Sequence, residues 1–560
     1  MIKELKSLIT KTNCLKFIYN LNLTKLILLL LLLNCYSCSY NKSKPFIKES
    51  KLQTYVEQFN ADDEELYSNI TNEDAYDFLK NNIPLLECPD INFERTYYFR
   101  WWTYRKHIKH TPDGYVITEF LPDVDWSGKH NTISCPAAHH FYEGRWLHNF
   151  KFLDDYSYFW FRKGGAPRLY SFWAADAMYN RYLVSSDSKP LLDLLPDLIE
   201  NYKAWETGWD WYGHHIGKRK NGLFYTLDDR DGGELSVGGH GYRPSLNSYM
   251  FGDAVAISKI AKMAGKPDLE KKFFNKAVEI KSLVQNKLWD KEAAFFKVLP
   301  APMGEKDREE VSAVISDARE LYGYTPWYFN MPDKGYEIAW KYLMDKDGFY
   351  APYGPTYLEQ RHPKFEISYK GHECLWNGPS WPLATCNVLT SLANLLNNYD
   401  QNIINKEDYF ELLKIYTNSH KLKRDDGKVV SWIDENLNPY TGDWIARTRL
   451  KSWKNGTWSK EKGGKERGKD YNHSTYNDLV ITGLMGLRPR NDNFIEVNPL
   501  IPKDMWDYFC LDNVLYHNKI LTLVWDKHGD KYNRGKGFML FVDGKLMAHK
   551  ETIQKIKISY

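Results

Sequence analysis

The sequence lacks features that mark several large classes of protein. Its 75 Lys and Arg residues nearly balance 72 Asp and Glu residues, and the resulting net charge of +3 gives no signal for a nucleic-acid partner. The longest aliphatic run, residues 26–33, has eight residues and is too short to cross a bilayer. The chain also shows no strict internal repeat. With these classes disfavoured, the sequence indicates a large protein that carries nearly equal numbers of positive and negative charges.

Cysteines are few, and their spacing indicates no shared ligand. The five cysteines beyond residue 38 are Cys88, Cys135, Cys374, Cys386 and Cys510. Their odd number, wide spacing and lack of a CxxC pair predict neither a zinc site nor a disulfide framework. The histidine pair at 139–140 has no third ligand at metal spacing. The sequence therefore predicts no metal and no other cofactor.

Aromatic residues, in contrast, are abundant. The chain holds 20 Trp, 40 Tyr and 27 Phe residues, which together make 16% of its length. Aromatic side chains fill large cores, and their faces also stack on the apolar faces of sugar rings. Both uses fit here, and the excess favours a carbohydrate ligand.

The first residues resemble a bacterial export signal. Five lysines precede the aliphatic run 26–33, and a small residue stands before Cys38 soon after that run. We therefore predict a lipoprotein signal peptide over 1–38 that ends at lipidated Cys38, with Cys35 as a second candidate and plain secretion as the alternative. The polar stretch 39–50 reads as a tether. This predicts an exported, membrane-anchored lipoprotein in the periplasm or at the cell surface of a bacterium.

The middle of the chain has the periodicity of helix after helix. Apolar residues recur at steps of three and four over 247–264 and 268–289, and further helices are expected at 306–320, 333–344, 380–398 and 406–419. Long loops rich in glycine and aromatic residues separate them. This pattern favours an α/α toroid whose loops gather on one face. The last 68 residues, 493–560, alternate apolar and polar residues and predict a small antiparallel β domain.

Residues 221–253 form an acidic loop that leads into a helix. Asp228, Asp229, Asp231 and Glu234 stand among glycines that exclude a helix interior. Carboxylates on a loop held by a rigid scaffold suit acid–base chemistry. A calcium loop or a solvated acidic turn is the alternative reading. Residues 116–122 read as a short strand or loop that carries Glu119.

Two further motifs follow the acidic loop. The stretch 374–389 reads CLWNGPSWPLATCNVL, in which Trp376 and Trp381 flank Asn377-Gly-Pro-Ser before a helix. The stretch 432–444 places Glu435 just before a turn made by Pro439 and Gly442.

In this order the three motifs resemble the inverting (α/α)6 glycosidases of family 63, in the clan that includes trehalases. Residues 376–381 are similar to the family's WRGPxW, with Asn377 in place of arginine, and 435–442 are similar to ExYxPxTG, with Leu437 in place of tyrosine. DGGELS, 231–236, is similar to SGxDNS when Glu234 falls on the acid. The likeness covers roughly 140–490 and is strongest to bacterial proteins of the mannosylglycerate-hydrolase-like type.

The resemblance implies a mostly α fold, an (α/α)6 toroid with long aromatic loops and a small C-terminal antiparallel β domain. It also implies a glycoside hydrolase catalytic domain over 51–490 and a β domain over 491–560. The expected reaction is hydrolysis of an oligo- or polysaccharide by paired carboxylates, with inversion. The expected partners are the carbohydrate and, through the lipid anchor, a membrane.

The resemblance and the chemistry together suggest roles for particular residues. Glu234 is expected to be the acid, with Asp231 as the alternative, and Glu435 to be the base. The expected substrate contacts are Trp209, Trp211, Trp376, Asn377, Trp381 and either Arg243 or Arg168.

Two other functions stay open at the level of sequence. Polysaccharide lyases also combine an α/α toroid with a β domain, and His214, His215 and Tyr242 are candidates for a lyase base. A glycan-binding lipoprotein without catalysis is the other alternative, and the presence of both acidic motifs counts against it.

Overall fold

A computed structural model describes residues 46–63, 69–211, 214–302, 314–370, 374–452 and 467–560. At 209–211, 214–215 and 449–452 it describes the backbone only. The predicted signal peptide with Cys38, and most of the predicted tether, lie outside the described residues. Residues Ile47–Tyr560 form one compact unit. Within the described ranges, no helix combines the length and the apolar character needed to cross a membrane.

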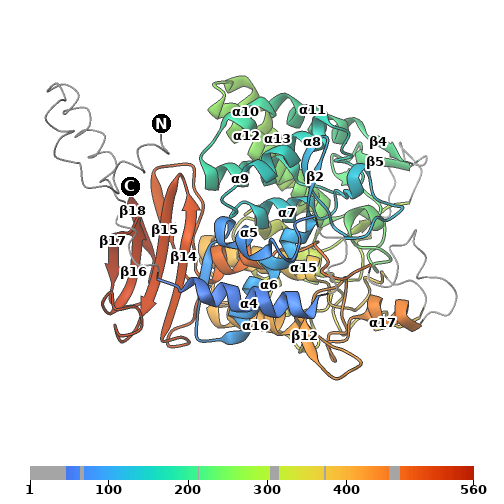
Figure 1. Cartoon of the computed structure of the whole chain (residues 1–560). Helices are drawn as coiled ribbons and strands as arrows, with labels where there is room; N and C mark the ends of the chain where they lie inside the picture. Colours follow the sequence, from blue (N-terminus) through green and yellow to red (C-terminus); the bar gives the residue numbers. More distant parts are fainter. Residues whose placement is uncertain (1–45, 64–68, 212–213, 303–313, 371–373, 453–466) are drawn as a thin grey trace, which may run out of the picture. The chain divides into compact units, whose positions relative to one another are not determined.

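The body of the protein is helical (Figure 1). Its α-helices are α4 (Glu49–Asp62), α5 (Ala75–Asn82), α6 (Ile91–His107), α7 (Ala137–Gly144), α8 (Lys151–Arg162), α9 (Ala174–Ser185), α10 (Lys189–Asp193), α11 (Leu195–Thr207), α12 (Pro244–Met263), α13 (Pro267–Lys287), α14 (Thr325–Tyr328), α15 (Pro382–Asn398), α16 (Lys406–Ser419) and α17 (Ile445–Ser452). Shorter turns are the 3₁₀ helices η1 (Lys129–Asn131), η2 (Asp229–Asp231), η3 (Leu321–Tyr324) and η4 (Glu337–Tyr342) and the π-helix η6 (Leu479–Leu484).

Four expected helices agree with α12, α13, α15 and α16 to within a few residues. The expected helix at 333–344 is only the 3₁₀ helix η4. The one expected at 306–320 lies mostly outside the described residues, and its described end, 314–320, is not helical. For 333–344, packing overrides the helical period of the sequence.

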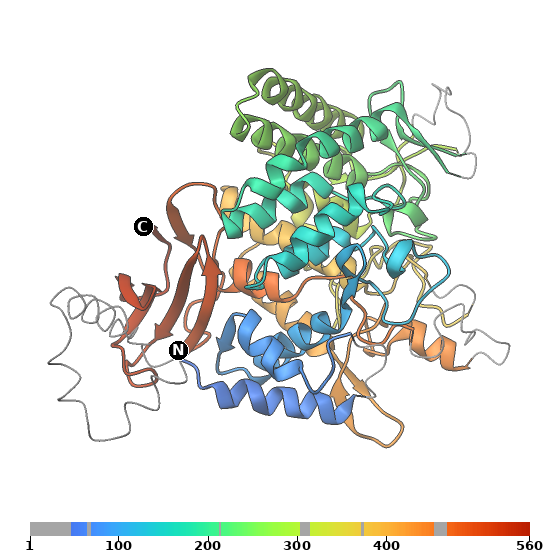
Figure 2. The same cartoon turned by 45° about the horizontal axis from the view of Figure 1, so that its top comes forward.

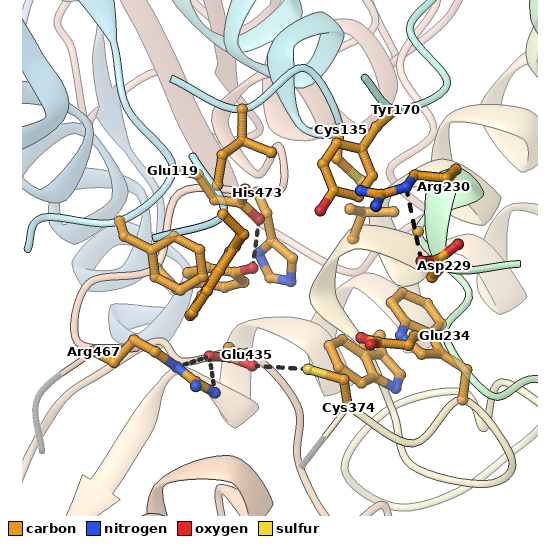
Figure 3. A pocket seen from close by; sticks show the side chains of 18 residues that line it. Glu119, Cys135, Tyr170, Asp229, Arg230, Glu234, Cys374, Glu435, Arg467 and His473 are labelled. Atoms are coloured by element: carbon orange, nitrogen blue, oxygen red, sulfur yellow. Dashed lines mark hydrogen bonds and ion pairs between the residues drawn. The ribbon is translucent and has the colours of Figure 1, made fainter. Parts of the chain in front are cut away.

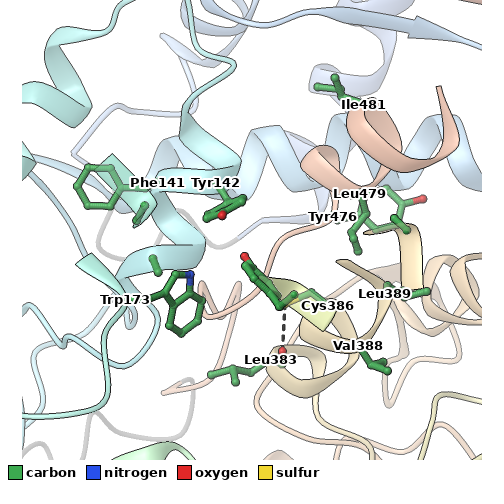
Figure 4. Packing of buried hydrophobic residues seen from close by; sticks show 14 of the residues in the cluster. Phe141, Tyr142, Trp173, Leu383, Cys386, Val388, Leu389, Tyr476, Leu479 and Ile481 are labelled. Carbon is green, nitrogen blue, oxygen red and sulfur yellow. Dashed lines mark hydrogen bonds between the residues drawn. The ribbon is translucent and has the colours of Figure 1, made fainter. Parts of the chain in front are cut away.

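Most aromatic residues are in the core. Eight of the 20 tryptophans are among the largest side chains that are less than 2% exposed. Trp173 stacks on Tyr249 of α12, with ring centroids 4.2 Å apart. Figure 4 shows Trp173, the residue just before α9, beside Phe141 and Tyr142 of α7 and facing Leu383 and Cys386 of α15. Core packing therefore accounts for most of the aromatic excess.

The C-terminal part is an antiparallel sheet, as expected. Its strands are β14 (Tyr508–Tyr516), β15 (Lys519–Asp526), β16 (Gly537–Val542) and β17 (Lys545–Lys550), with a separate pair β13 (Phe494–Val497) and β18 (Ile556–Ser559). A fifth strand, β1 (Leu85–Glu87), pairs with β14 at the edge, with Leu86 opposite Leu511. Figures 1 and 2 both show this sheet on the side away from β4 (Trp209–Trp211) and β5 (His214–Lys218).

The remaining strands belong to the loops. They are β2 (Ile108–Thr111), β3 (Gly114–Ile117), β6 (Phe224–Tyr225), β7 (Gly241–Tyr242), β8 (Trp289–Asp290), β9 (Phe295–Phe296), β10 (Leu299–Pro300), β11 (Lys421–Lys423) and β12 (Val429–Ser431). The acidic loop runs from β6 to β7, and α12 begins right after it at Pro244. Similarly, α15 begins at Pro382 after Trp381. Proline at the first helical position presets φ without losing a hydrogen bond, so both helices start where these loops end.

Candidate active site

One cavity of about 380 Å³ collects residues from loops far apart in the chain (Figure 3). Its walls are made by Glu119, Phe120, Trp126, Ile133, Cys135, Tyr170, Asp229, Arg230, Gly232, Glu234, Cys374, Trp376, Trp381, Leu383, Glu435, Arg467, Tyr471 and His473. In Figure 3, Glu119, Glu435 and Arg467 lie on one side and Asp229, Arg230 and Glu234 on the other. The two carboxylates expected to act as a pair therefore face the same cavity.

Glu435 is held by an arginine. Its side chain and that of Arg467 are each 3% exposed, and Oε1 accepts hydrogen bonds of 2.8 Å from the arginine Nε and Nη2. The other oxygen, Oε2, lies 3.6 Å from Sγ of Cys374. Charge-assisted bonds to a planar guanidinium fix a carboxylate in direction as well as in place. Glu435 is thus preorganised, with Oε2 on the side of Cys374.

The main chain around this pair is tightly packed. A Cβ atom at Gly468 would lie 1.9 Å from Oδ1 of Asp434, so only glycine fits next to Arg467. Burial raises the pKa of Asp434 to about 7, and the charge of Glu435 adds to this effect. The Asp434 carboxylate also accepts the main-chain N–H of Glu435 at 2.8 Å.

A buried ionic cluster holds the segment that follows Arg467. Lys106 Nζ lies 2.9 Å from Asp63 and 2.8 Å from Asp470, and Lys469 Nζ lies 2.7 Å from Asp63. All four side chains are at most 5% exposed. Buried charges of this kind persist only when they are paired. The cluster therefore ties residues 467–473 to α6 and to the end of α4.

The acidic loop is fixed by its own carboxylates. Asp231 is buried and accepts hydrogen bonds from Arg243 Nε at 2.8 Å and from the hydroxyl of Ser245. Burial raises the pKa of Asp231, and the Arg243 charge opposes this effect. Asp228 is buried as well, which by itself raises its pKa, but the hydrogen bond and charge of His240 together with the charge of Arg243 more than offset burial and lower the pKa of Asp228. These acids order the loop and are turned toward its interior.

Glu234 faces the cavity from this ordered loop. It is partly exposed, and its carbonyl accepts the N–H of Trp376 at 3.1 Å. Leu235, the next residue, has φ 58° and is 53% exposed, which is a strained backbone for a leucine. Gly232 has φ 62°, and a Cβ there would lie 2.9 Å from Sγ of Cys135. The loop therefore bends sharply on both sides of Glu234.

Two of the expected tryptophans form a wall of the cavity. Trp376 and Trp381 stack with ring centroids 3.9 Å apart and an interplanar angle of 8°. Asn377 between them is not among the residues that line the cavity, and its main-chain carbonyl accepts the N–H of Glu366. Trp209 and Trp211 fall in β4, where the structure describes the backbone only, so their side chains lie outside the described part.

The other expected contacts lie off the cavity. Arg243 is fully buried, and its guanidinium donates hydrogen bonds of 2.7–3.1 Å to Asp231, Gly239 and Tyr357. It therefore orders the acidic loop. Arg168 donates to Asn201 at 2.9 Å. Tyr242, a candidate base for a lyase, is 1% exposed. None of these three residues lines the cavity, so they are poorly placed to contact a sugar bound there.

Sequence reasoning gave no role to several residues of the wall. Arg467, Tyr471 and His473 follow a lysine-rich stretch without a motif, and Glu119 stands alone in an apolar segment. Burial lowers the pKa of His473 well below its usual range, so its imidazole is neutral. A lone acid in the apolar stretch VITEFLP was the one available signal for Glu119.

Comparison with known proteins finds two domain families and several solved structures that are similar to this chain. The model of the mannosylglycerate hydrolase MGH1-like glycoside hydrolase domain matches residues 129–474, and that of the C-terminal domain of glycosyl hydrolase family 65 matches 487–549. A solved structure described as a sialidase is 42% identical with a TM-score of 0.81. The match covers 91% of this chain and 45% of that one, so this chain spans less than half of that protein.

Two more distant structures are also similar. A GH78 family rhamnosidase of Bacillus sp. GL1 is 9% identical with a TM-score of 0.51, over 84% of this chain and 42% of that one, which is a likeness of fold. A GH63 mannosylglycerate hydrolase from Thermus thermophilus is 12% identical with a TM-score of 0.41, over 77% of this chain and 98% of that one. Since the first of the two family models matches more than half of this chain, the chain belongs to the mannosylglycerate hydrolase MGH1-like glycoside hydrolase family.

Proposed function

We propose that this glycoside hydrolase is exported and cleaves an oligo- or polysaccharide with inversion, using Glu435 as base and Glu234 as acid within an (α/α)6 toroid. The observation that carries the proposal is the placement of these two carboxylates on opposite walls of one cavity (Figure 3). An inverting enzyme needs two such groups about 6.5–9.5 Å apart, with space for a water molecule between one of them and the sugar.

The proposed reaction is a single displacement. Oε2 of Glu435 takes a proton from water, and the water oxygen bonds to the anomeric carbon. The bond from that carbon to the leaving oxygen breaks at the same time, and Glu234 gives its proton to the leaving oxygen. The acid and the base exchange protonation states, and solvent restores them. Partial exposure of Glu234 suits a group that must regain a proton from water after each turnover.

The walls of the cavity suit a sugar ring. Trp376 and Trp381 present a stacked aromatic surface, and Trp126 and Tyr170 also line the site. The volume of about 380 Å³ is near the lower end of the roughly 300–1,000 Å³ typical of small-ligand sites. This size supports binding of a terminal sugar unit rather than a long stretch of polysaccharide.

The toroid is proposed from the pairing of helices. α12 packs on α13 and α9, and α15 packs on α14 and α16, as successive helix pairs of a toroid do. The loops that precede α12 and α15 both reach the cavity. A toroid places such loops at one end, which agrees with the position of Glu234 and of Trp381.

Export and lipid anchoring are proposed from the sequence of the first residues. Cys38→Ser should move the protein from the membrane fraction to the soluble fraction, because one acylation site carries the whole anchor. Fractionation followed by immunodetection checks this, with Cys88→Ser as the matched control. A serine variant that still sediments with membranes would refute anchoring at Cys38.

The activity itself is tested by a release screen. Wild-type protein and the double variant Glu234→Gln/Glu435→Gln are incubated with a panel of plant, bacterial and animal glycans and of 4-nitrophenyl glycosides. We expect release of sugar from at least one substrate by wild type and loss of that release in the double variant. Equal release by both proteins would contradict the assignment of the two carboxylates.

A further inference from the structure

A third carboxyl group lines the cavity on the same side as Glu435. Glu119 follows β3 and is 5% exposed, and its carbonyl accepts the N–H of Asn472 at 3.0 Å. The same asparagine donates from Nδ2 to the carbonyl of Thr118 at 3.2 Å. The main chain beneath Glu119 is therefore fixed to the segment that carries Arg467 and His473.

Glu119 and Glu435 differ in what holds them. The arginine on this wall, Arg467, is bonded to Glu435. Glu119 accepts a hydrogen bond at Oε1 from the hydroxyl of Tyr471, while no lysine or arginine of the described chain forms an ion pair with it. Oε2 has no hydrogen-bond partner among the described residues.

Six side chains surround or interact with Glu119, and burial decides its protonation. They are Glu435, Arg467, Tyr471, His473, Cys135 and Tyr170. Burial raises the pKa of Glu119 to about 8, and the charge of Glu435 adds to this, while the hydrogen bond from Tyr471 and the charge of Arg467 oppose it. The imidazole of His473 is neutral and contributes no positive charge. With its pKa raised in this way, Glu119 favours the protonated form at neutral pH, on the same wall as the arginine-bound Glu435.

We infer that Glu119 is a specificity-determining residue that, in its protonated form, donates a hydrogen bond from Oε2 to an oxygen of the bound sugar. This inference rests on the proposed function, because it assumes that the sugar occupies this cavity. Tyr471 occupies Oε1, which leaves Oε2 to carry the proton. If Glu119 were ionised, two negative carboxylates would face the same sugar hydroxyl groups. Glu119 could then accept hydrogen bonds from the sugar but could not donate one.

The test compares Glu119→Gln with Glu119→Ala on the 4-nitrophenyl glycoside that wild type hydrolyses fastest. Glutamine keeps the acceptor for Tyr471 and supplies an N–H donor that does not titrate. We expect Glu119→Gln to keep kcat/KM within about threefold at pH 6.5, and Glu119→Ala to lose about tenfold or more. Because 4-nitrophenolate is a good leaving group that needs little protonation by Glu234, the alkaline decline on this substrate should report Glu119: wild-type kcat/KM should fall about tenfold from pH 7 to pH 9, and the glutamine variant should lack this decline.

Glu143→Gln is the matched control. Glu143 is a buried acid whose pKa burial raises to about 7, but it lies off the cavity and accepts main-chain N–H groups of 476–478. Its substitution should leave the alkaline limb of the wild-type pH profile in place. A glutamine variant at 119 that is as impaired as the alanine variant, or that keeps the wild-type alkaline limb, would overturn the inference.

A second readout needs no substrate. An acid with a raised folded pKa stabilises the fold most below its unfolded value of about 4.3 and loses this contribution as pH rises toward its folded value. The melting temperature of wild type relative to Glu119→Gln should therefore fall from pH 5 to pH 8. A constant difference would show that Glu119 is ionised in the folded protein and would overturn the inference. Failure of the proposed function would be seen in a different experiment, because Glu435→Gln would then keep full activity.

Discussion

The two walls of the cavity are built in opposite ways. Glu435 is almost fully buried, bonded twice to Arg467, and supported by the ionic cluster around Lys106. Glu234 is partly exposed and sits in a glycine-rich loop next to the strained Leu235. Arg243 is bonded to Asp231 and holds that loop, while Arg467 is bonded to Glu435 itself.

This difference separates the two proposed roles. A base that must orient a water molecule gains from a fixed, charged carboxylate, and an arginine provides both properties. An acid must carry a proton at the start of the reaction and recover it from solvent, and the partial exposure of Glu234 suits that exchange. The predictions below test whether the two walls differ in function as they differ in structure.

The largest effect is expected at Glu435. Glu435→Gln should lower kcat by about 10²- to 10⁴-fold, because the amide cannot take a proton from water. The amide oxygen still accepts from Arg467, so the variant should fold, as judged by circular dichroism. Steady-state kinetics on the best aryl glycoside measures the loss. Activity within a few-fold of wild type, with an unchanged spectrum, would remove Glu435 from the role of base.

A large effect that depends on the leaving group is expected at Glu234. Glu234→Ala should lower hydrolysis of a natural glycoside by about 10²-fold or more, since a poor leaving group needs the proton. A glycosyl fluoride of the same sugar needs less protonation and should be cleaved at a rate much closer to that of wild type. Asp231→Ala is the control from the same loop and should weaken both substrates by one similar, smaller factor. The reverse pattern would transfer the acid role to Asp231.

A smaller effect on turnover, with a clear effect on stability, is expected at Arg467. Arg467→Met leaves Glu435 buried without its partner and should lower the free energy of unfolding by about 3–5 kcal/mol. Arg467→Lys keeps the charge but not the paired donors, and it should fall between wild type and the methionine variant. Urea unfolding followed by tryptophan fluorescence measures both. If the methionine variant unfolds like wild type, the pair with Glu435 does not preorganise this wall.

Local patterns in the sequence were enough for much of the fold. The steps of three and four in 268–289 predicted α13, and the alternation in 493–560 predicted the C-terminal sheet. The strand β1 was not predicted, because its partner Leu511 is far away in sequence and pairing at that distance leaves no local pattern. Arg467 was missed for a similar reason, because it stands 32 residues after Glu435 and no local pattern links the two.

For the site, the motifs identified the residues whose main chain is unusual. Glycines marked the loop of Glu234, and the tryptophan motif marked Trp376 and Trp381, which do line the cavity. Charge alone did not distinguish a residue that faces the cavity from one that orders a loop, as Arg243 illustrates. Glu119 has no motif at all, since its raised pKa arises from burial by residues distant in the chain.

The most direct test of paired carboxylates with a water between them is the configuration of the first product. Wild-type enzyme is mixed with the glycoside it cleaves fastest, and the anomeric protons are followed by NMR from the first minute, before mutarotation. A base that activates water and an acid on the opposite wall predict that the released sugar first appears with the anomeric configuration opposite to that of the substrate. A product that first appears with the substrate's configuration would mean that a carboxylate attacks the sugar directly, and it would contradict the assignment of Glu435 as a base acting through water.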